Sequence, residues 1–283
     1  MTIDGRTGEA GLPLRPVRFT FPDRASLVWS AKPELAIAAN SVSLMMPHVE
    51  PFVARSVRAC LALVADPQLS AEAKGFVRQE TQHQTQHRRY NHLLTARYRG
   101  LSRIERWMER TYRLVETKTS SRFGVAFAAG FETVAFCAAR WVDTHADDVL
   151  LDADPDGASL FLWHLAEEVE HKAVANDVYR SIGGKRPLYA VAMLLSAFLL
   201  AWFSVLGTLT MMWHERRLLK PVAHLRMLVW SVTFLFVLLP VMAVSVLPGH
   251  DPRDLADPFR LHSWITGSFD GIDAMGVKVF QLG

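Results

Sequence analysis

The chain has 283 residues, 50% of them hydrophobic, and a formal net charge of +3 at pH 7. This length is sufficient for one large domain with its own core. Basic and acidic residues are interspersed, with no Lys/Arg block among aromatic residues, which argues against nucleic-acid binding. Cys60 and Cys137 lie far apart in apolar stretches, which excludes a disulfide scaffold. The first residues do not resemble a signal peptide, so we expect a cytoplasmic catalytic domain.

Residues 1–30 contain Gly, Pro and Arg without a sustained period and are predicted to form an extended arm. Beyond them, apolar residues recur every three or four positions, which is typical of helices. The first helix should break or restart near Pro47, because a proline inside a helix costs about 3 kcal/mol. No strand pattern of comparable length occurs, so the fold is predicted to be all-α. Helices are expected over about 33–65, 70–98, 102–117, 121–145 and 154–184.

Two apolar segments follow these helices. Pro187–Trp213 and Met227–Gly249 contain no Asp, Glu, Lys or Arg, and each reaches the roughly 20 residues that cross the hydrocarbon core of a bilayer. We therefore expect residues 185–249 to form an apolar helical hairpin that associates with a membrane. The alternative is a pair of core helices buried between the subunits of an oligomer. The tail, residues 250–283, contains no motif that predicts a function.

The charges beside the hairpin make conflicting predictions about its orientation. Arg216, Arg217 and Lys220 in the connecting loop should stay cytoplasmic, and so should Lys185 and Arg186 before the first segment. A spanning hairpin would place the two groups on opposite sides. A hairpin embedded in the cytoplasmic leaflet without crossing removes the conflict. The expected location is the cytoplasmic face of the inner membrane, or an integral membrane protein with a cytoplasmic catalytic domain.

A Glu-x-x-His motif occurs twice, at Glu80–His83 and at Glu168–His171. A spacing of three residues puts the carboxylate and the imidazole on one helix face. Each motif is preceded on an earlier helix by a lone glutamate, Glu50 or Glu132. Ferritin-like di-iron and di-manganese sites take one glutamate from each of two helices and a Glu-x-x-His from each of two others. The sequence therefore predicts a ferritin-like four-helix bundle over residues 31–184.

The residue types also suit two metal ions. Four carboxylates neutralise most of the charge of two divalent or trivalent ions, and a mixed set of carboxylates and imidazoles suits iron and manganese. Either Glu-x-x-His motif alone would be interpreted as a solvated helix face. Glu132 differs, because a carboxylate in an Ala/Phe/Val helix is costly to bury without a partner.

Other polar residues share these helix faces. His164 precedes Glu168 by four residues and is a third nitrogen ligand, a partner outside the ligand shell or an interfacial histidine. His87 follows His83 by four residues and is expected to orient a ligand or to relay protons. The glutamines of the same helix are expected only to solvate it; these are Gln79, Gln82, Gln84 and Gln86.

Three stretches resemble the bacterial family described as predicted metal-dependent hydrolase. They are Ser43–Glu50, Arg78–His83 with the following His87, and Trp163–Val174. The resemblance covers about residues 30–250, and its most specific motif is Trp-His-x-x-Glu-Glu-x-Glu-His. It implies a metal-dependent enzyme, with hydrolysis as the family's predicted activity.

The ligand pattern also resembles that of the di-iron N-oxygenases that oxidise p-aminobenzoate. Their last metal helix carries His-x-x-x-Glu-x-x-His, which matches His164, Glu168 and His171 here. This likeness implies that His164 is a seventh ligand. The full implied ligand set is Glu50, Glu80, His83, Glu132, His164, Glu168 and His171.

The preferred hypothesis from these patterns is a di-iron oxygenase or oxidase. Two iron ions, or manganese or zinc in their place, would be the cofactors, and dioxygen would oxidise an unidentified small-molecule or lipid-like substrate. A separate electron-donor protein is expected, and a homodimer is compatible with the sequence. The alternatives are a di-metal hydrolase, in which the two ions activate water, and a non-catalytic iron-binding membrane protein.

Overall fold

All regular elements in the computed structural model are helices within the residues that it describes, which are 11–15, 17–21 and 26–265. The prediction of an all-α protein is therefore confirmed. The first ten residues of the predicted arm and residues 266–283 of the tail lie outside the described ranges. The elements in chain order are α1 (Pro33–Ser43), α2 (Met46–Cys60), η1 (Leu61–Leu63), α3 (Pro67–Arg97), α4 (Leu101–Lys118), α5 (Ser121–Thr144), α6 (Ala146–Val149), α7 (Pro155–His171), α8 (Val174–Ser181), α9 (Arg186–His214), α10 (Pro221–Ser245), η2 (Pro252–Asp254) and α11 (Phe259–Ile265).

The helix expected over residues 33–65 is divided at the predicted break. α1 ends at Ser43, and Pro47 lies in the first turn of α2. A proline there loses no helical hydrogen bond, because the first amide groups of a helix have no partner within it. The helix expected over residues 154–184 is also divided, since α7 ends at His171 and α8 begins at Val174.

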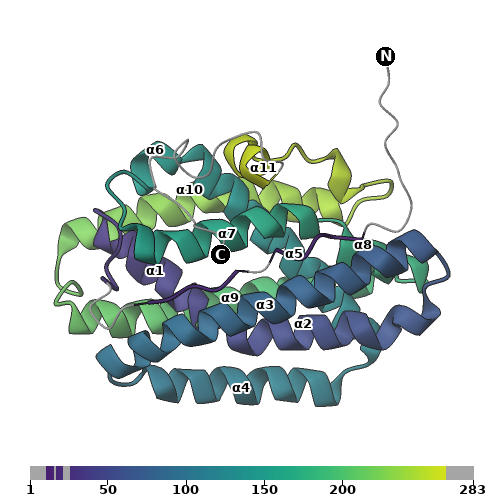
Figure 1. Cartoon of the computed structure of the whole chain (residues 1–283), viewed down its shortest axis with the longest axis horizontal. Coiled ribbons are helices and arrows are strands. Elements are labelled where there is room, and N and C mark those ends of the chain that lie inside the picture. Colours follow the sequence, from purple (N-terminus) through teal and green to yellow (C-terminus); the bar gives the residue numbers. More distant parts are fainter. Residues whose placement is uncertain (1–10, 16, 22–25, 266–283) are drawn as a thin grey trace.

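Helices α2, α3, α5 and α7 pack around one interior, and most long helices run close to the long axis of the molecule (Figure 1). α5 is the central helix of this arrangement, because it contacts α2, α7 and α8 as well as α9 and α10. Its sequence explains this position, since Ala, Gly, Val and Phe side chains are buried along almost its whole length. α4 packs against α2 at the edge of the bundle.

The two apolar helices lie along the bundle and do not project from it. α9 packs against α5 and α1, and α10 packs against α5. Two glycines allow close approach along α9: a Cβ on Gly130 would lie 2.5 Å from Met193, and a Cβ on Gly207 would lie 2.8 Å from Ser41. On α10, Thr233 accepts a hydrogen bond from the indole of Trp141 at 2.9 Å. The hairpin is therefore joined to the bundle at several points along its length.

The loop between α9 and α10 is bound to the bundle as well. Glu34, at the start of α1, is 1% exposed and pairs with Arg217 at 2.7 Å and with Arg226 at 3.3 Å. Burial raises the pKa of Glu34, but hydrogen bonds from its own backbone amide, Arg226 and Arg217 bring it below its ordinary value. Tyr98, at the end of α3, donates a hydrogen bond to Glu215 at 2.9 Å. The basic loop is therefore packed against the bundle.

Within the described residues, three helices are long and apolar enough to cross a membrane by length and composition, namely α5, α9 and α10. The apolar window of α5 is 78% buried inside the protein, whereas those of α9 and α10 are 33% and 17% buried. α5 thus serves as a core helix. α9 and α10 present large apolar surfaces outward.

We predict that Glu34→Gln lowers the free energy of unfolding by about 1–3 kcal/mol, because it leaves two guanidinium groups without their shared carboxylate. Urea unfolding followed by circular dichroism measures this change. Because the pKa of folded Glu34 is lowered, its contribution is present at neutral pH and is lost as the pH falls below the ordinary range of glutamate.

Glu116→Gln is the matched control, since Glu116 pairs with Arg55 on the surface, where the side chains are 34% and 52% exposed. Exposed pairs contribute about 0–1 kcal/mol. Equal effects of the two substitutions would show that the loop is not held by a buried ion pair.

Candidate metal centre

The four bundle helices place all the predicted ligands in one buried interior. α2 contributes Glu50 and α5 contributes Glu132, one residue each. Helices α3 and α7 each present a Glu-x-x-His face, because positions three residues apart lie together on a helix. None of these residues is more than 8% exposed. The side chains gathered here are Glu50, Glu80, His83, His87, Glu132, His164, Glu168 and His171.

The two Glu-x-x-His motifs form the first cluster. Glu80, His83, Glu168 and His171 each offer a ligand atom within 4.8 Å of the others. His83 Nδ1 lies 3.7 Å from Glu80 and 3.5 Å from Glu168. His171 Nδ1 lies 3.0 Å from Glu80, and 3.6 Å from Glu132. Both imidazoles therefore direct Nδ1 towards the carboxylates.

Glu50, His87 and His164 form the second cluster. His164 Nε2 lies 3.6 Å from Glu50 and 2.8 Å from Glu168. Glu168 thus contacts both clusters, with one oxygen near His83 and His164 at once. A carboxylate in this position is suited to bridge two ions.

His87 belongs to the second cluster and contacts His164 directly. Its Nε2 is 2.6 Å from His164 Nδ1, and its Nδ1 is 2.8 Å from the Ser43 hydroxyl. One of the two imidazoles must donate and the other accept in the first contact. His87 is therefore a candidate eighth ligand as well as a partner that orients His164, and its role in proton transfer stays a prediction.

Many ligand atoms in this interior have no hydrogen-bond partner. Both oxygens of Glu50, Glu80 and Glu132 are buried without one, and so are Nδ1 of His83 and Nδ1 of His171. Unsatisfied polar atoms are rare in protein interiors, and buried charges are normally paired or bound to metal ions. Two cations satisfy carboxylates that the protein itself leaves without partners, so the residues present fit a di-metal centre.

Burial and the close spacing of these groups also shift their pKa values. Burial, followed by repulsion from Glu80 and Glu168, raises the pKa of Glu50 and of Glu132 well above the ordinary value. Burial and the neighbouring His164 lower the pKa of His83 well below its usual range. Neutral imidazole is the form that binds a metal ion, so the environment of His83 favours a ligand.

Two residues that support the ligands were missed by sequence reasoning. His83 Nε2 contacts Glu167 at 3.0 Å, and His171 Nε2 contacts Gln79 at 2.8 Å. Fixing the outer ring nitrogen in this way orients the inner one, as is usual for metal-bound histidines. Gln79 and Glu167 each stand directly before a ligand glutamate, which is the sequence signal that could have identified them.

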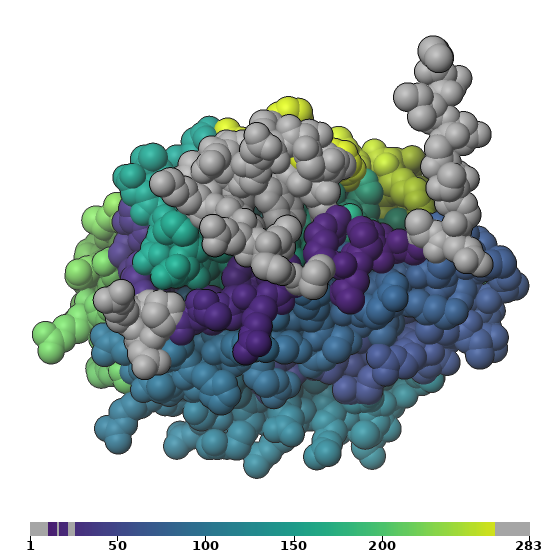
Figure 2. Space-filling view, in the orientation of Figure 1, coloured from purple at the N-terminus to yellow at the C-terminus, as the bar shows by residue number. Residues whose placement is uncertain are grey.

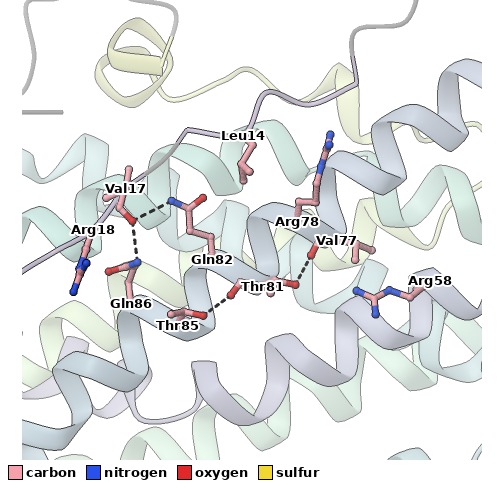
Figure 3. Close-up of a pocket in the computed structure, with 10 residues that line it drawn as sticks. All are labelled: Leu14, Val17, Arg18, Arg58, Val77, Arg78, Thr81, Gln82, Thr85 and Gln86. Atoms are coloured by element: carbon pink, nitrogen blue, oxygen red, sulfur yellow. Dashed lines mark hydrogen bonds between the residues drawn. The ribbon is translucent and has the colours of Figure 1, made fainter. Parts of the chain in front are cut away.

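The expectation that the α3 glutamines only solvate the helix is wrong for three of them. The side-chain amide of Gln79 donates to the backbone carbonyl of Pro13 at 2.9 Å. Gln82 donates to Arg15 O at 2.6 Å, and Gln86 donates to Val17 O at 2.9 Å. These glutamines lie on one face of α3 and bind backbone carbonyls of the arm. Figure 3 shows Gln82 and Gln86 beside Val17, and Figure 2 shows the arm lying across the surface of the bundle.

The described part of the arm reaches the centre through Arg15. Its guanidinium binds Glu167 at 3.2 Å and Glu170 at 2.8 Å. Because Glu167 contacts His83, the arm is linked to a ligand through two successive contacts. Gly75 lets the arm lie close to α3, since a Cβ there would be 2.7 Å from the backbone of Leu12.

Two cavities open beside the bundle and neither contains a ligand atom of the candidate centre. One of about 710 Å³ lies between the arm and α3, and its arginines, Arg18, Arg58 and Arg78, form no ion pair within the described residues (Figure 3). The other, of about 340 Å³, includes Asn91, whose amide oxygen accepts a hydrogen bond from Ser43. Ser43 in turn contacts His87, so this cavity is connected to the second cluster through side chains.

Comparison with known proteins gives one family. No curated protein and no solved structure was found to match the chain. A family model described as predicted metal-dependent hydrolase matches residues 13–256, which include the second half of the arm, both clusters and the apolar hairpin. The chain therefore belongs to the predicted metal-dependent hydrolase family.

Proposed function

We propose that the protein is a metal-dependent hydrolase with a two-metal centre. The observation that carries this proposal is the set of buried carboxylate oxygens and Nδ1 atoms without partners. The first ion would be held by the first cluster and the second by the second cluster, with Glu168 between them. Glu132, next to His171, would complete the ligand shell.

Hydrolysis is supported by the family description and by the chemistry of such centres. Two bound ions lower the pKa of water and neutralise charge on a phosphate or ester oxygen. The chain itself supplies the carboxylates of Glu50 and Glu132, which would help to hold the ions and balance their charge. Gln79 and Glu167 hold the two ligand imidazoles in position.

A second candidate function is oxidation by dioxygen at a di-iron centre. The observation that favours it is the complete burial of a ligand set rich in carboxylates, because iron and manganese suit such ligands and hydrolysis does not require exclusion of water. This function would need an electron-donor protein and a small-molecule or lipid-like substrate. A non-catalytic iron-binding protein is the remaining alternative.

We further propose that the protein works at the cytoplasmic face of a membrane, where its exposed apolar helices would be covered.

We predict about two metal ions per purified chain, and loss of at least one of them in Glu132→Ala and in Glu168→Ala. Elemental analysis of the purified protein measures this. Glu116→Ala, on the surface of α4, is the control and should keep the full metal content. Wild-type protein without bound metal, after refolding in the presence of iron, manganese or zinc, would contradict the proposal of a metal centre.

The same samples separate the reactions. Cleavage of phosphate or carboxylate esters that is lost in Glu168→Ala supports hydrolysis. Redox-active iron that consumes dioxygen in a substrate-dependent way would contradict hydrolysis and support oxidation by dioxygen. Tight metal binding without either activity would favour the non-catalytic alternative.

We predict that Glu132→Gln changes stability in opposite directions with and without metal. In the metal-free protein it should raise the free energy of unfolding by about 1–3 kcal/mol at pH 8, because one buried carboxylate no longer has to carry a charge or hold a proton. In the metal-loaded protein it should lower stability, because a ligand is lost. Thermal unfolding with and without a chelator measures both changes.

The gain in the metal-free protein should shrink as the pH falls. The pKa of folded Glu132 is raised, so its penalty is absent below the ordinary pKa of glutamate and grows as the pH rises above it. Destabilisation of both forms by equal amounts would mean that Glu132 has a packing role only.

We predict that Gln79→Ala and Glu167→Gln lower metal affinity by about 10–100-fold, because each frees a ligand imidazole to rotate. Competition with a chelator of known affinity measures the change. Gln82→Ala is the control, since Gln82 binds the arm but no ligand. An equal loss of affinity in Gln82→Ala would assign the effect to the arm instead of the imidazoles.

A further inference from the structure

The outer surface of the apolar hairpin is the largest feature that the metal centre leaves unexplained. On α9, large apolar side chains at intervals of three and four residues are exposed, with Leu194 and Phe198 at 60% and Trp202 at 50%. This spacing puts them in one stripe along the helix. The stripe on α9 consists of Val191, Leu194, Phe198, Trp202, Val205, Leu209 and Trp213, and α10 separately exposes Leu225, Leu228, Val229, Val232, Leu235, Phe236 and Leu239.

We propose that this face docks flat on a bilayer containing anionic lipids, with α9 and α10 lying parallel to the membrane plane and not crossing it. The inference rests on the membrane location proposed above but not on the metal chemistry. Large exposed apolar surfaces are uncommon on soluble monomers and mark membrane or protein contacts.

The contacts between the hairpin and the bundle exclude a membrane-spanning hairpin that is separated from the bundle. Gly130 and Gly207 pack against Met193 and Ser41 near the two ends of α9, and Thr133 contacts the Tyr189 hydroxyl at 2.9 Å. The loop is held by the buried Glu34. A hairpin that spans with its loop on the far side would break all of these contacts.

The charges on α4 exclude a membrane-spanning orientation in which the bundle enters the bilayer together with α9. α9 runs lengthwise beside the bundle (Figure 1), so an upright α9 would bring the outer face of α4 to bilayer depth. Charged side chains at that depth are strongly unfavourable. The exposed charges on α4 are Arg103, Arg106, Glu109, Arg110, Arg113 and Lys118.

The charges at the ends of the stripe favour an anionic lipid surface over a second copy of the chain. Lys185 and Arg186 are exposed at the start of α9, and Arg216 and Lys220 are exposed beyond its end. None of these four forms a salt bridge within the described residues. Basic side chains at the margin of an apolar face attract anionic headgroups. Protein interfaces carry about one hydrogen bond per 100–200 Å², whereas the stripe offers only hydrocarbon and indole groups.

The first test is flotation of the full chain with vesicles of phosphatidylcholine, with and without phosphatidylglycerol. We expect binding that increases with phosphatidylglycerol, and a loss of at least about tenfold in Leu194→Glu/Phe198→Glu. Leu63→Glu is the matched control, because Leu63 is 65% exposed on η1, outside the stripe. Unchanged binding by the double variant, or dimerisation of wild-type protein without vesicle binding, would overturn the proposal.

Two further measurements do not depend on the double variant. Tryptophan fluorescence of the wild type should be quenched by brominated lipids, and absence of quenching in bound protein would contradict docking through this face. For orientation, Leu219→Cys in the loop and Arg110→Cys on α4 are compared, because both native cysteines are buried.

In inside-out membrane vesicles from expressing cells, an impermeant maleimide should label both introduced cysteines. Labelling of Arg110→Cys alone would show a spanning hairpin, which overturns flat docking but keeps the membrane location. Absence of the protein from the membranes would overturn both. The metal content of Leu194→Glu/Phe198→Glu should equal that of the wild type, so a failure of docking is distinct from a failure of the metal centre.

Discussion

Four glutamates buried in one helical interior are the constraint on which the rest of the structure depends. An unpaired buried carboxylate is costly, and like charges at this separation raise one another's pKa. The protein does not relieve this cost with its own donors, since Glu50, Glu80 and Glu132 lack hydrogen-bond partners. It places imidazoles around them instead. Bound cations would balance this negative charge, which would link folding, metal content and pH in one equilibrium.

The support around the centre has an internal symmetry. In each motif the residue before the ligand glutamate binds the histidine of the other motif: Gln79 holds His171, and Glu167 holds His83. Each helix therefore fixes the ring orientation on its partner, so α3 and α7 must be in register before either imidazole is in place. The arm extends this coupling, because Arg15 binds Glu167 from outside the bundle.

Sequence patterns predicted the features that depend on the local geometry of single helices. Helix positions followed from apolar periodicity, and the convergence of Glu80 with His83 followed from the helical turn. Contacts between distant segments could not be predicted in the same way, because their partners are set by how helices pack. The arm carbonyls bound by Gln82 and Gln86, and the pairing of Glu34 with Arg217, are of this kind. Glutamine side chains on a helix look alike in sequence whether they bind water or backbone.

α5 lies between the candidate metal centre and the apolar helix α9. On one side this helix carries Glu132, and on the other it packs against α9 through Gly130 and binds Tyr189 through Thr133. Both α5 and α9 lie between the centre and the outer apolar stripe, and each helix is about 10 Å wide. A substrate arriving from lipid would therefore approach the centre beside α5, whereas one arriving from water would pass Asn91 and Ser43 next to His87.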